Sequence, residues 1–328
     1  MVSKIFNKPK VYFRADGNPE LGLGHLIRCI AFGQALKDHF VIIFVCKDIP
    51  DKIASDVIFN DFKLVKIEEE SIFLNQLLQG DLVILDGYGF DWDYQIQIKM
   101  LGCKLVCLDD LHNRLFAADL IINVAPGVSP KDYKGAAGIR FALGPDYALL
   151  RSTFLKPPVR KPINNLESVF ICFGGADLRN LTESTLRVVL DIPCFKRIIV
   201  VTGASFNEMS SFQNISNSKV EYFHAMNEHE IHDLMCQSDV AIVPASGILF
   251  EALVTECKVI SGYCVDNQIG IYNGFLNAGA IVGAHRFAEC DLRKAISRIP
   301  DHVFNKIVDR KSSSRLLKEI ENVCSNIS

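Results

Sequence analysis

The chemistry that this sequence suggests is concentrated in residues 14–28, RADGNPELGLGHLIR. An apolar run precedes the stretch and an amphipathic run follows it, which predicts a strand, a glycine-rich loop and a helix. In α/β proteins this unit commonly holds phosphate groups at the start of its helix. His25 stands at that start, where the positive end of the helix dipole favours the neutral imidazole. We therefore predict that His25 is a general base, with a histidine that merely caps the helix as the alternative.

Glycines and charged residues of the same stretch are the other candidates near that histidine. Gly22 and Gly24 allow a ligand to approach the backbone closely. Arg14, Asp16 and Arg28 would place three charges around one histidine, and charges in such a setting are expected to be paired or to bind something. Asp16 is predicted to orient the histidine or to hold a sugar. The two arginines are predicted to orient the histidine, to hold a sugar or to balance the charge of Asp16.

Two alternating series of strands and helices are predicted to position these residues. The chain has 328 residues, 49% of them hydrophobic, which suffices for two domains. Strands are predicted at 10–14, 40–46, 62–67, 81–86, 104–108 and 120–124, and again at 168–175 with its two glycines, 195–203, 220–223, 240–244 and 259–263. Helices are predicted over 25–38, from 50, over 71–79, over 91–101, from 180, and over 302–323.

Continuous Val/Ile/Leu strands separated by helices are typical of parallel sheets covered on both faces. We therefore predict an α/β protein with two doubly wound, Rossmann-like domains that face a cleft. The first domain is predicted over residues 1–155 and the second over 167–328. Residues 156–166 are rich in proline and charge and are predicted to be the linker.

Polar residues that follow the strands are further candidates for ligand binding, because open α/β sheets bind ligands at the carboxyl ends of their strands. Asp86, Asp109, Asp110 and His112 share this location but receive no individual role. A helix starting near Ser246 would leave N–H groups free for an anion. The candidates for binding are Tyr88, Gly174, Gly175, Asp177, Ala245, Ser246, Glu251, Asn267 and Gln268. A structural role, chiefly as a helix cap or turn residue, is the alternative for the polar side chains.

Composition argues against several other classes of protein. A net charge of −3 argues against a general nucleic-acid binder. Most of the 11 cysteines lie in apolar runs, so we predict core residues rather than disulfides, and no spacing typical of zinc ligands is present. The first ten residues lack the apolar segment of a secretory signal, and no apolar run reaches the length of a membrane span. We predict a cytoplasmic protein that binds a small molecule and needs no metal or other cofactor.

Taken together, these motifs resemble the UDP-sugar hydrolases of pseudaminic acid biosynthesis. The resemblance spans essentially the whole chain and is carried by Arg14-X-Asp16, Gly22-X-Gly24-His25-X-X-Arg28, Phe173-Gly-Gly175-X-Asp177, Ala245-Ser246 with Glu251, and Asn267-Gln268. That family releases UDP from UDP-2,4-diacetamido-2,4,6-trideoxy-β-L-altropyranose and is related to glycosyltransferases of the GT-B fold. The glycosyltransferases usually have a proline where this chain has Arg28.

The resemblance implies a GT-B fold and a metal-independent UDP-sugar hydrolase. It implies that His25 accepts a proton from a water molecule that attacks C1 with inversion, without a covalent intermediate. The first domain would carry this base and the sugar, and the second would bind UDP. Backbone N–H groups at Gly174-Gly175 and Ala245-Ser246 would hold the pyrophosphate, Glu251 the ribose, and Tyr88 and Asn267 the sugar or a phosphate.

Other classes of function fit some of the same residues. A GT-B glycosyltransferase would use the same UDP-sugar donor with a sugar or lipid acceptor in place of water. A non-catalytic nucleotide-sugar-binding protein would keep the cleft without the chemistry. A dinucleotide-dependent oxidoreductase fits less well, because His25 and Arg28 stand where the Gly-X-Gly-X-X-Gly motif has small residues. The oligomeric state does not follow from the sequence.

Overall fold

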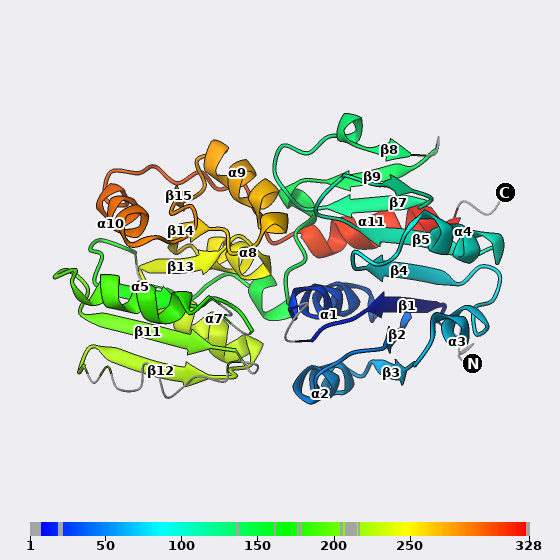
Figure 1. The fold of residues 1–328 in the computed structure, drawn as a ribbon, viewed down its shortest axis with the longest axis horizontal. Coiled ribbons are helices and arrows are strands. Elements are labelled where there is room, and N and C mark those ends of the chain that lie inside the picture. The colour runs from blue at the N-terminus through cyan, green and yellow to red at the C-terminus, as the bar shows by residue number, and fades with distance from the viewer. Residues whose placement is uncertain are drawn as a thin grey trace, which may run out of the picture.

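In the computed structural model the chain forms two parallel β-sheets, each flanked by helices, which lie beside one another (Figure 1). The structure describes residues 8–18, 22–135, 138–160, 162–175, 177, 179–203, 206, 215 and 217–325. Part of the first glycine-rich loop, residues 19–21, therefore lies outside the described residues. The prediction of two doubly wound α/β units is confirmed.

The first unit is built on a seven-stranded sheet with the order β3-β2-β1-β4-β5-β7-β9, whose neighbouring strands are all parallel. Its strands are β1 (Lys10–Ala15), β2 (Val41–Cys46), β3 (Lys63–Lys66), β4 (Leu82–Asp86), β5 (Lys104–Leu108), β7 (Leu120–Asn123) and β9 (Arg140–Leu143). Its helices are α1 (Gly24–Leu36), α2 (Asp51–Phe59), α3 (Glu70–Leu74) and α4 (Trp92–Met100). A separate pair is formed by β6 (Leu115–Phe116) and β8 (Lys134–Gly135). The short strand β9 was not predicted, and α3 is shorter than the predicted helix over 71–79.

The second unit is built on a six-stranded parallel sheet with the order β12-β11-β10-β13-β14-β15. Its strands are β10 (Ser168–Ile171), β11 (Arg197–Thr202), β12 (Val220–His224), β13 (Val240–Pro244), β14 (Lys258–Gly262) and β15 (Val282–Gly283). The helices among the described residues of this unit are α5 (Leu181–Leu190), α7 (Glu228–Cys236), α8 (Gly247–Val254), α9 (Ile269–Asn277) and α10 (Glu289–Arg298). In both sheets a central strand is followed by a glycine-containing loop and a helix, as the repeated sequence pattern predicts.

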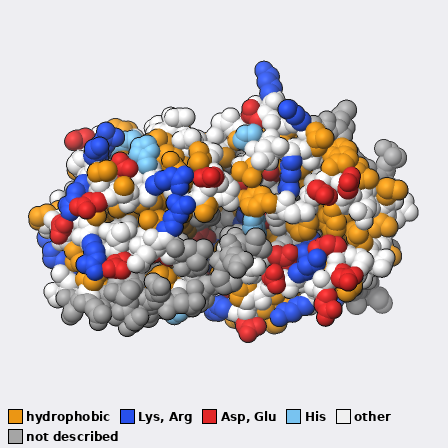
Figure 2. Space-filling model, viewed as in Figure 1, with side chains coloured by type: hydrophobic (Ala, Val, Ile, Leu, Met, Phe, Trp, Pro, Cys, Tyr) orange, Lys and Arg blue, Asp and Glu red, His pale blue; other side chains and the backbone are white. Residues whose placement is uncertain are grey.

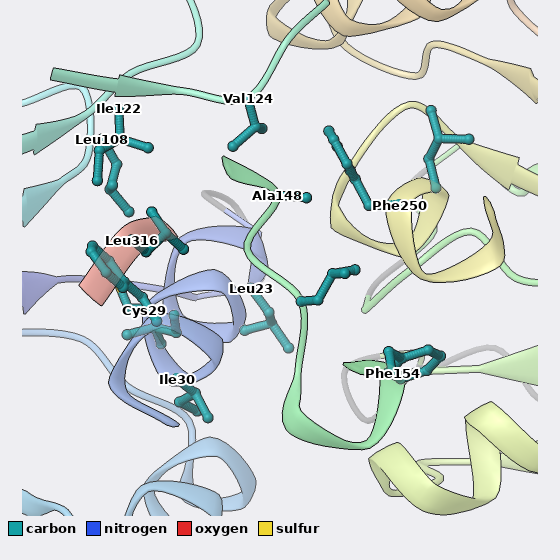
Figure 3. Packing of buried hydrophobic residues seen from close by; sticks show 14 of the residues in the cluster. Leu23, Cys29, Ile30, Leu108, Ile122, Val124, Ala148, Phe154, Phe250 and Leu316 are labelled. Atoms are coloured by element: carbon teal, nitrogen blue, oxygen red, sulfur yellow. The ribbon is translucent and has the colours of Figure 1, made fainter. Parts of the chain in front are cut away.

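A continuous apolar core joins the two units where the chain crosses between them. Ile30 of α1, Phe154 of the short helix η3 (Ser152–Leu155) and Phe250 of α8 belong to one cluster of buried residues. Figure 3 shows Ile30 and Phe250 on opposite sides of the crossing segment, which carries Phe154. Burial of such a side chain stabilises a fold by roughly 1.5–3 kcal/mol. We infer that this packing helps to fix how the two units face each other.

The final helix differs from the predicted helix over 302–323. α11 spans Ser312–Ser325, because the residues before it bond to the turn after α9 instead of forming a helix. Nε2 of His302 and the backbone N–H of Asn305 both lie 3.1 Å from the carbonyl oxygen of Gly279. α11 then returns to the first unit, where it packs against α1 (Figure 1). The division into two domains at 156–166 stays a prediction. It places α11 in the second domain, whereas the helix packs on the first unit.

Charged side chains of both signs are scattered over the face of the molecule in Figure 2, among hydrophobic and neutral ones. This distribution accords with the small net charge of −3. All 11 cysteines are free, and Cys29, Cys46, Cys103, Cys107, Cys172 and Cys257 are buried. Within the described ranges, no helix combines the length and apolar character that crossing a membrane requires.

Candidate active site

Adjacent elements of the first unit bring His25 and Asp86 together. His25 is the second residue of α1, which follows β1, and Asp86 ends β4, which pairs with β1 so that Asp86 lies opposite Ala15. Nδ1 of His25 lies 2.7 Å from Oδ1 of Asp86. Nη2 of Arg28, which is a donor, lies farther from the same nitrogen at 3.2 Å. Because a carboxylate only accepts hydrogen bonds, we assign the proton to Nδ1 from the shorter contact, which leaves Nε2 as the proton acceptor. This tautomer suits a general base.

Arg28, one turn further along α1, joins two carboxylates of the site. Its Nε and Nη2 atoms each donate to one oxygen of Asp86 at 2.6 Å, and its Nη1 donates to Oδ1 of Asp110 at 2.7 Å. Asp86 is 0% exposed. Burial acts to raise the pKa of Asp86, but the charges of Arg28 and His25 and their hydrogen bonds hold it well below its ordinary value. Asp86 is therefore an ionised group that can fix the orientation of His25.

Tyr88 connects this cluster to the second unit. Its hydroxyl donates to Oδ2 of Asp110 at 3.0 Å and accepts a hydrogen bond from Nδ2 of Asn267 at 2.6 Å. Burial, followed by the charge of Asp110, raises the pKa of Tyr88, so the hydroxyl keeps its proton at neutral pH. The Tyr88 ring packs against the His25 ring with the centroids 5.1 Å apart. Four of the predicted site residues, His25, Arg28, Tyr88 and Asn267, are thus brought together.

Asp86 and Asp110 are the functional residues to which the sequence analysis gave no role. Asp86 ends β4, and Asp110 follows the end of β5, which is the next strand of the sheet. Their position after apolar strands was the available signal. Their shared partner Arg28 became evident only from the strand order β1-β4-β5, which brings both carboxylates beside the start of α1.

The structure corrects one of the two roles predicted for Asp16, that of orienting His25, whereas the role of holding a sugar stays a prediction. The β1 chain turns after Ala15, so that Oδ1 of Asp16 accepts the backbone N–H groups of Lys47 and Asp48 at 2.6 and 3.1 Å. Arg14 also turns inward and is 1% exposed. Its guanidinium pairs with Asp16 at 2.7 Å and with Glu70 at 2.7 Å. Both side chains therefore hold the loops after β1 and β2 in place rather than contacting the histidine.

Replacement of Glu70 by glutamine is expected to lower the free energy of unfolding by about 1–2 kcal/mol at neutral pH. Burial acts to raise the pKa of Glu70, but hydrogen bonds from Arg14 and Tyr94 lower it from 4.5 to about 2. A carboxylate with a depressed pKa stabilises the fold above its unfolded value and loses this effect as the pH falls toward the folded value. Urea unfolding should therefore show the difference shrinking below pH 4.5. The neighbouring exposed Glu69 provides the control, and an effect of Glu70→Gln that is constant with pH would contradict this.

The two glycine-rich loops meet between the units. Gly22 has φ +82° and Gly174 φ +85°, a backbone region that favours glycine. Leu23 lies directly before α1 and is 7% exposed. A Cβ atom at Gly175 would lie 3.0 Å from Cδ1 of Leu23, so the second loop packs closely on the first. The start of α1, formed by Gly24, therefore lies next to the loop predicted to bind pyrophosphate.

Asp177 and Gln268 make the contacts of the structural alternative, and their binding roles stay predictions. The carboxylate of Asp177 accepts the backbone N–H groups of Leu181 and Thr182 at 2.9 and 2.7 Å, and so occupies the start of α5. Oε1 of Gln268 accepts the N–H of Cys264 at 2.8 Å and closes the turn before α9. For these two residues the structure favours the capping alternative.

The start of α8 is open, but the available donors are not those predicted. The N–H of Ala245 donates to the carbonyl of Gly262, and that of Ser246 donates to the carbonyl of Pro244, each at 2.8 Å. Ser246 precedes the helix, and its side chain makes no capping hydrogen bond. The first N–H groups of a helix have no partner within it, which leaves those of Gly247 and Ile248 for an anion.

Glu251 of α8 is paired within the protein. It is 4% exposed, and its two oxygens accept hydrogen bonds from Arg151 at 2.6 and 2.7 Å. Arg151 directly precedes η3, so this pair lies where the first unit leads into the second. Each carboxylate oxygen has two lone pairs, so Glu251 retains the capacity to accept further hydrogen bonds.

The described part of the chain contains no group of three or more His, Cys, Asp or Glu residues that could hold a metal ion. The charged cluster beside His25 consists of Asp86, Asp110 and Arg28, and the arginine bonds to both carboxylates. What this cluster offers chemically is an oriented base.

Comparison with known proteins confirms the resemblance stated from the motifs. The UDP-2,4-diacetamido-2,4,6-trideoxy-β-L-altropyranose hydrolase of Campylobacter jejuni is 26% identical to this chain over 268 residues, which cover 79% of the chain and 93% of that protein. No protein-family model matches the chain.

Solved structures establish the fold. A putative UDP-N-acetylglucosamine 2-epimerase from Listeria monocytogenes superposes with a TM-score of 0.63 at 12% identity, covering 98% of both chains. A glycosyltransferase from Rickettsia africae superposes with a TM-score of 0.56 at 11% identity, covering 98% of this chain and 100% of that one. The predicted GT-B fold is confirmed, and at these identities the likeness concerns the fold alone.

Proposed function

We propose that this chain is a hydrolase that releases UDP from UDP-2,4-diacetamido-2,4,6-trideoxy-β-L-altropyranose. The observation that carries the proposal is His25, oriented by the buried Asp86 at the start of α1 and next to the glycine loop of the second unit. The name of the Campylobacter relative supports an enzyme that acts on UDP-sugars and supplies the sugar in the proposal. The test is UDP release from this compound by the purified protein.

In the proposed reaction, Nε2 of His25 takes a proton from a water molecule as the water oxygen forms a bond to C1 of the sugar. The bond between C1 and the phosphate oxygen breaks, and its electron pair leaves with UDP. Attack from the side opposite UDP inverts C1. The buried Asp86 balances the imidazolium that forms. UDP is a stabilised anion, so its departure needs hydrogen-bond donors more than an acid.

The second unit offers groups for the pyrophosphate and the ribose of UDP. The open start of α8 supports binding of the pyrophosphate there, since its N–H groups and helix dipole favour an anion and Asp177 already occupies the start of α5. Glu251 would accept the ribose hydroxyls with its remaining lone pairs, while Arg151 keeps it oriented.

Asn267 is the group that we assign to the sugar. Its Nδ2 donates to Tyr88, whereas its Oδ1 is buried and has no hydrogen-bond partner among the described residues. A buried acceptor without a partner is unfavourable, and an N–H or O–H group of the bound sugar would satisfy it. The two acetamido groups of the proposed substrate carry such N–H donors.

Treatment with EDTA is expected to change the rate of UDP release by less than about twofold. The reason is that the start of α8 would supply the donors for the pyrophosphate charge that a divalent cation supplies in metal-dependent enzymes. The measurement is the initial rate of UDP release before and after chelation. Loss of activity that added Mg²⁺ restores would contradict a metal-independent reaction.

A GT-B glycosyltransferase remains the second candidate, favoured by the structural likeness to the Rickettsia glycosyltransferase. The two functions differ in whether an acceptor other than water is needed. Sustained release of UDP from the substrate alone supports the hydrolase. Release that requires an added sugar or lipid acceptor supports the transferase.

A further inference from the structure

Tyr88 is held by hydrogen bonds from both units. Asp110 follows β5 in the first unit, and Asn267 lies in the short helix η4 (Asp266–Gln268) that precedes α9 in the second. The Tyr88 hydroxyl donates to Asp110 at 3.0 Å and accepts from Asn267 at 2.6 Å. Any rotation of the side chain away from this position breaks at least one of these bonds. The Tyr88 ring is therefore fixed in place when the two units are together.

The fixed ring lies against the proposed base. The ring planes of Tyr88 and His25 meet at 78° with a centroid distance of 5.1 Å. Asp86 also restrains the His25 ring, because its Oδ1 contacts Nδ1. The side chain of His25 is 12% exposed, whereas Tyr88 beside it is 43% exposed. A water molecule needs little room beside such a base, whereas an alcohol on a sugar or lipid brings a carbon skeleton that must fit as well.

We propose that Tyr88 determines the acceptor: tied to Asp110 and Asn267, it limits the nucleophile at His25 to water. This inference rests on the proposed function and adds the reason why the enzyme hydrolyses its substrate. When the ring is removed or released, an alcohol can take the place of water. The alcohol oxygen then bonds to C1, its proton passes to Nε2 of His25, and UDP leaves with the electrons of the broken C1–O bond. The product is an alkyl glycoside instead of the free sugar.

The experiment compares the products formed from the UDP-sugar in a mixture of water and ethylene glycol. The variants are Tyr88→Ala, which removes the ring, Tyr88→Phe, which keeps the ring without its tethers, and Asn267→Ala, which removes the tether from the second unit. UDP release and the ratio of 2-hydroxyethyl glycoside to free sugar are measured by chromatography and mass spectrometry. Tyr94→Phe is the matched control, because Tyr94 donates to Glu70 outside this cluster.

Wild type and Tyr94→Phe are expected to yield free sugar. Tyr88→Ala is expected to raise the glycoside ratio by at least about tenfold, with smaller rises for Tyr88→Phe and Asn267→Ala, while total UDP release slows. The same ratio in wild type and all variants would overturn the proposal. So would folded variants that release no UDP, because the ring would then be required for hydrolysis itself. A wild type that releases no UDP from this substrate would overturn the proposed function, and this inference with it.

Discussion

Replacing His25 with alanine is expected to lower the rate of UDP release by about 10²–10⁴-fold, which is the usual contribution of a general base. The binding of UDP should stay within about twofold, because the groups assigned to UDP lie in the second unit. The fold should persist as well, since Asp86 keeps both of its hydrogen bonds from Arg28. The measurements are the turnover of the UDP-sugar and the calorimetric affinity for UDP.

His39 provides the matched control for this substitution. It lies shortly after the same helix, and its side chain is 50% exposed. His39→Ala should therefore release UDP at the wild-type rate. If His25→Ala also retained the wild-type rate, the assignment of the base would be wrong. If it lost UDP binding together with turnover, His25 would be a binding residue instead.

Asp86→Asn is expected to reduce turnover by about 10²-fold or more and to destabilise the protein by about 1–3 kcal/mol, since Arg28 keeps its bond to Asp110. The amide oxygen of asparagine accepts hydrogen bonds, but its amide nitrogen does not. Arg28 therefore loses one of its two hydrogen bonds to residue 86 and keeps its charge in a buried site. An amide N–H that faces Nδ1 of His25 would also favour the tautomer with its proton on Nε2. In that tautomer Nε2 cannot accept a proton from water. The measurements are turnover at a temperature where the variant is folded and urea unfolding.

Asp109→Asn serves to separate the loss of turnover from the loss of stability, because Asp109 is another buried carboxylate at the same edge of the sheet. It is 4% exposed and accepts hydrogen bonds from the Tyr133 hydroxyl and the N–H of His112. This variant should lose stability but keep its turnover when folded. Equal turnover in folded Asp86→Asn and Asp109→Asn would show that the contact between Asp86 and His25 is not needed for the reaction.

The sequence was sufficient to predict the elements of the site that depend on local pattern. The apolar run of β1, the glycines and the amphipathic run of α1 place His25 at a helix start, and the structure has it as the second residue of that helix. The alternation of strands and helices likewise predicted the two parallel sheets. These features follow from residue periodicity and backbone preferences within about twenty residues.

The partners of each side chain could not be predicted, because they depend on strand order and on competition between neighbours. Asp16 is nearer to His25 in the sequence, but the β1 and β4 pairing brings Asp86 to it. Asp177 also carries a carboxylate, but its loop places this group where it accepts hydrogen bonds from the first N–H groups of α5. The return of α11 to the first unit depends on a contact with α1 that lies almost the whole chain away.

The central claim is that water attacks C1 of the sugar, and hydrolysis of the UDP-sugar in ¹⁸O-labelled water tests it most directly. We expect UDP to be released without any added acceptor, and mass spectrometry to find the label in the free sugar and none in UDP. Label in the terminal phosphate of UDP would show that the phosphorus–oxygen bond breaks instead. That result, or UDP release only in the presence of an acceptor, would contradict the account.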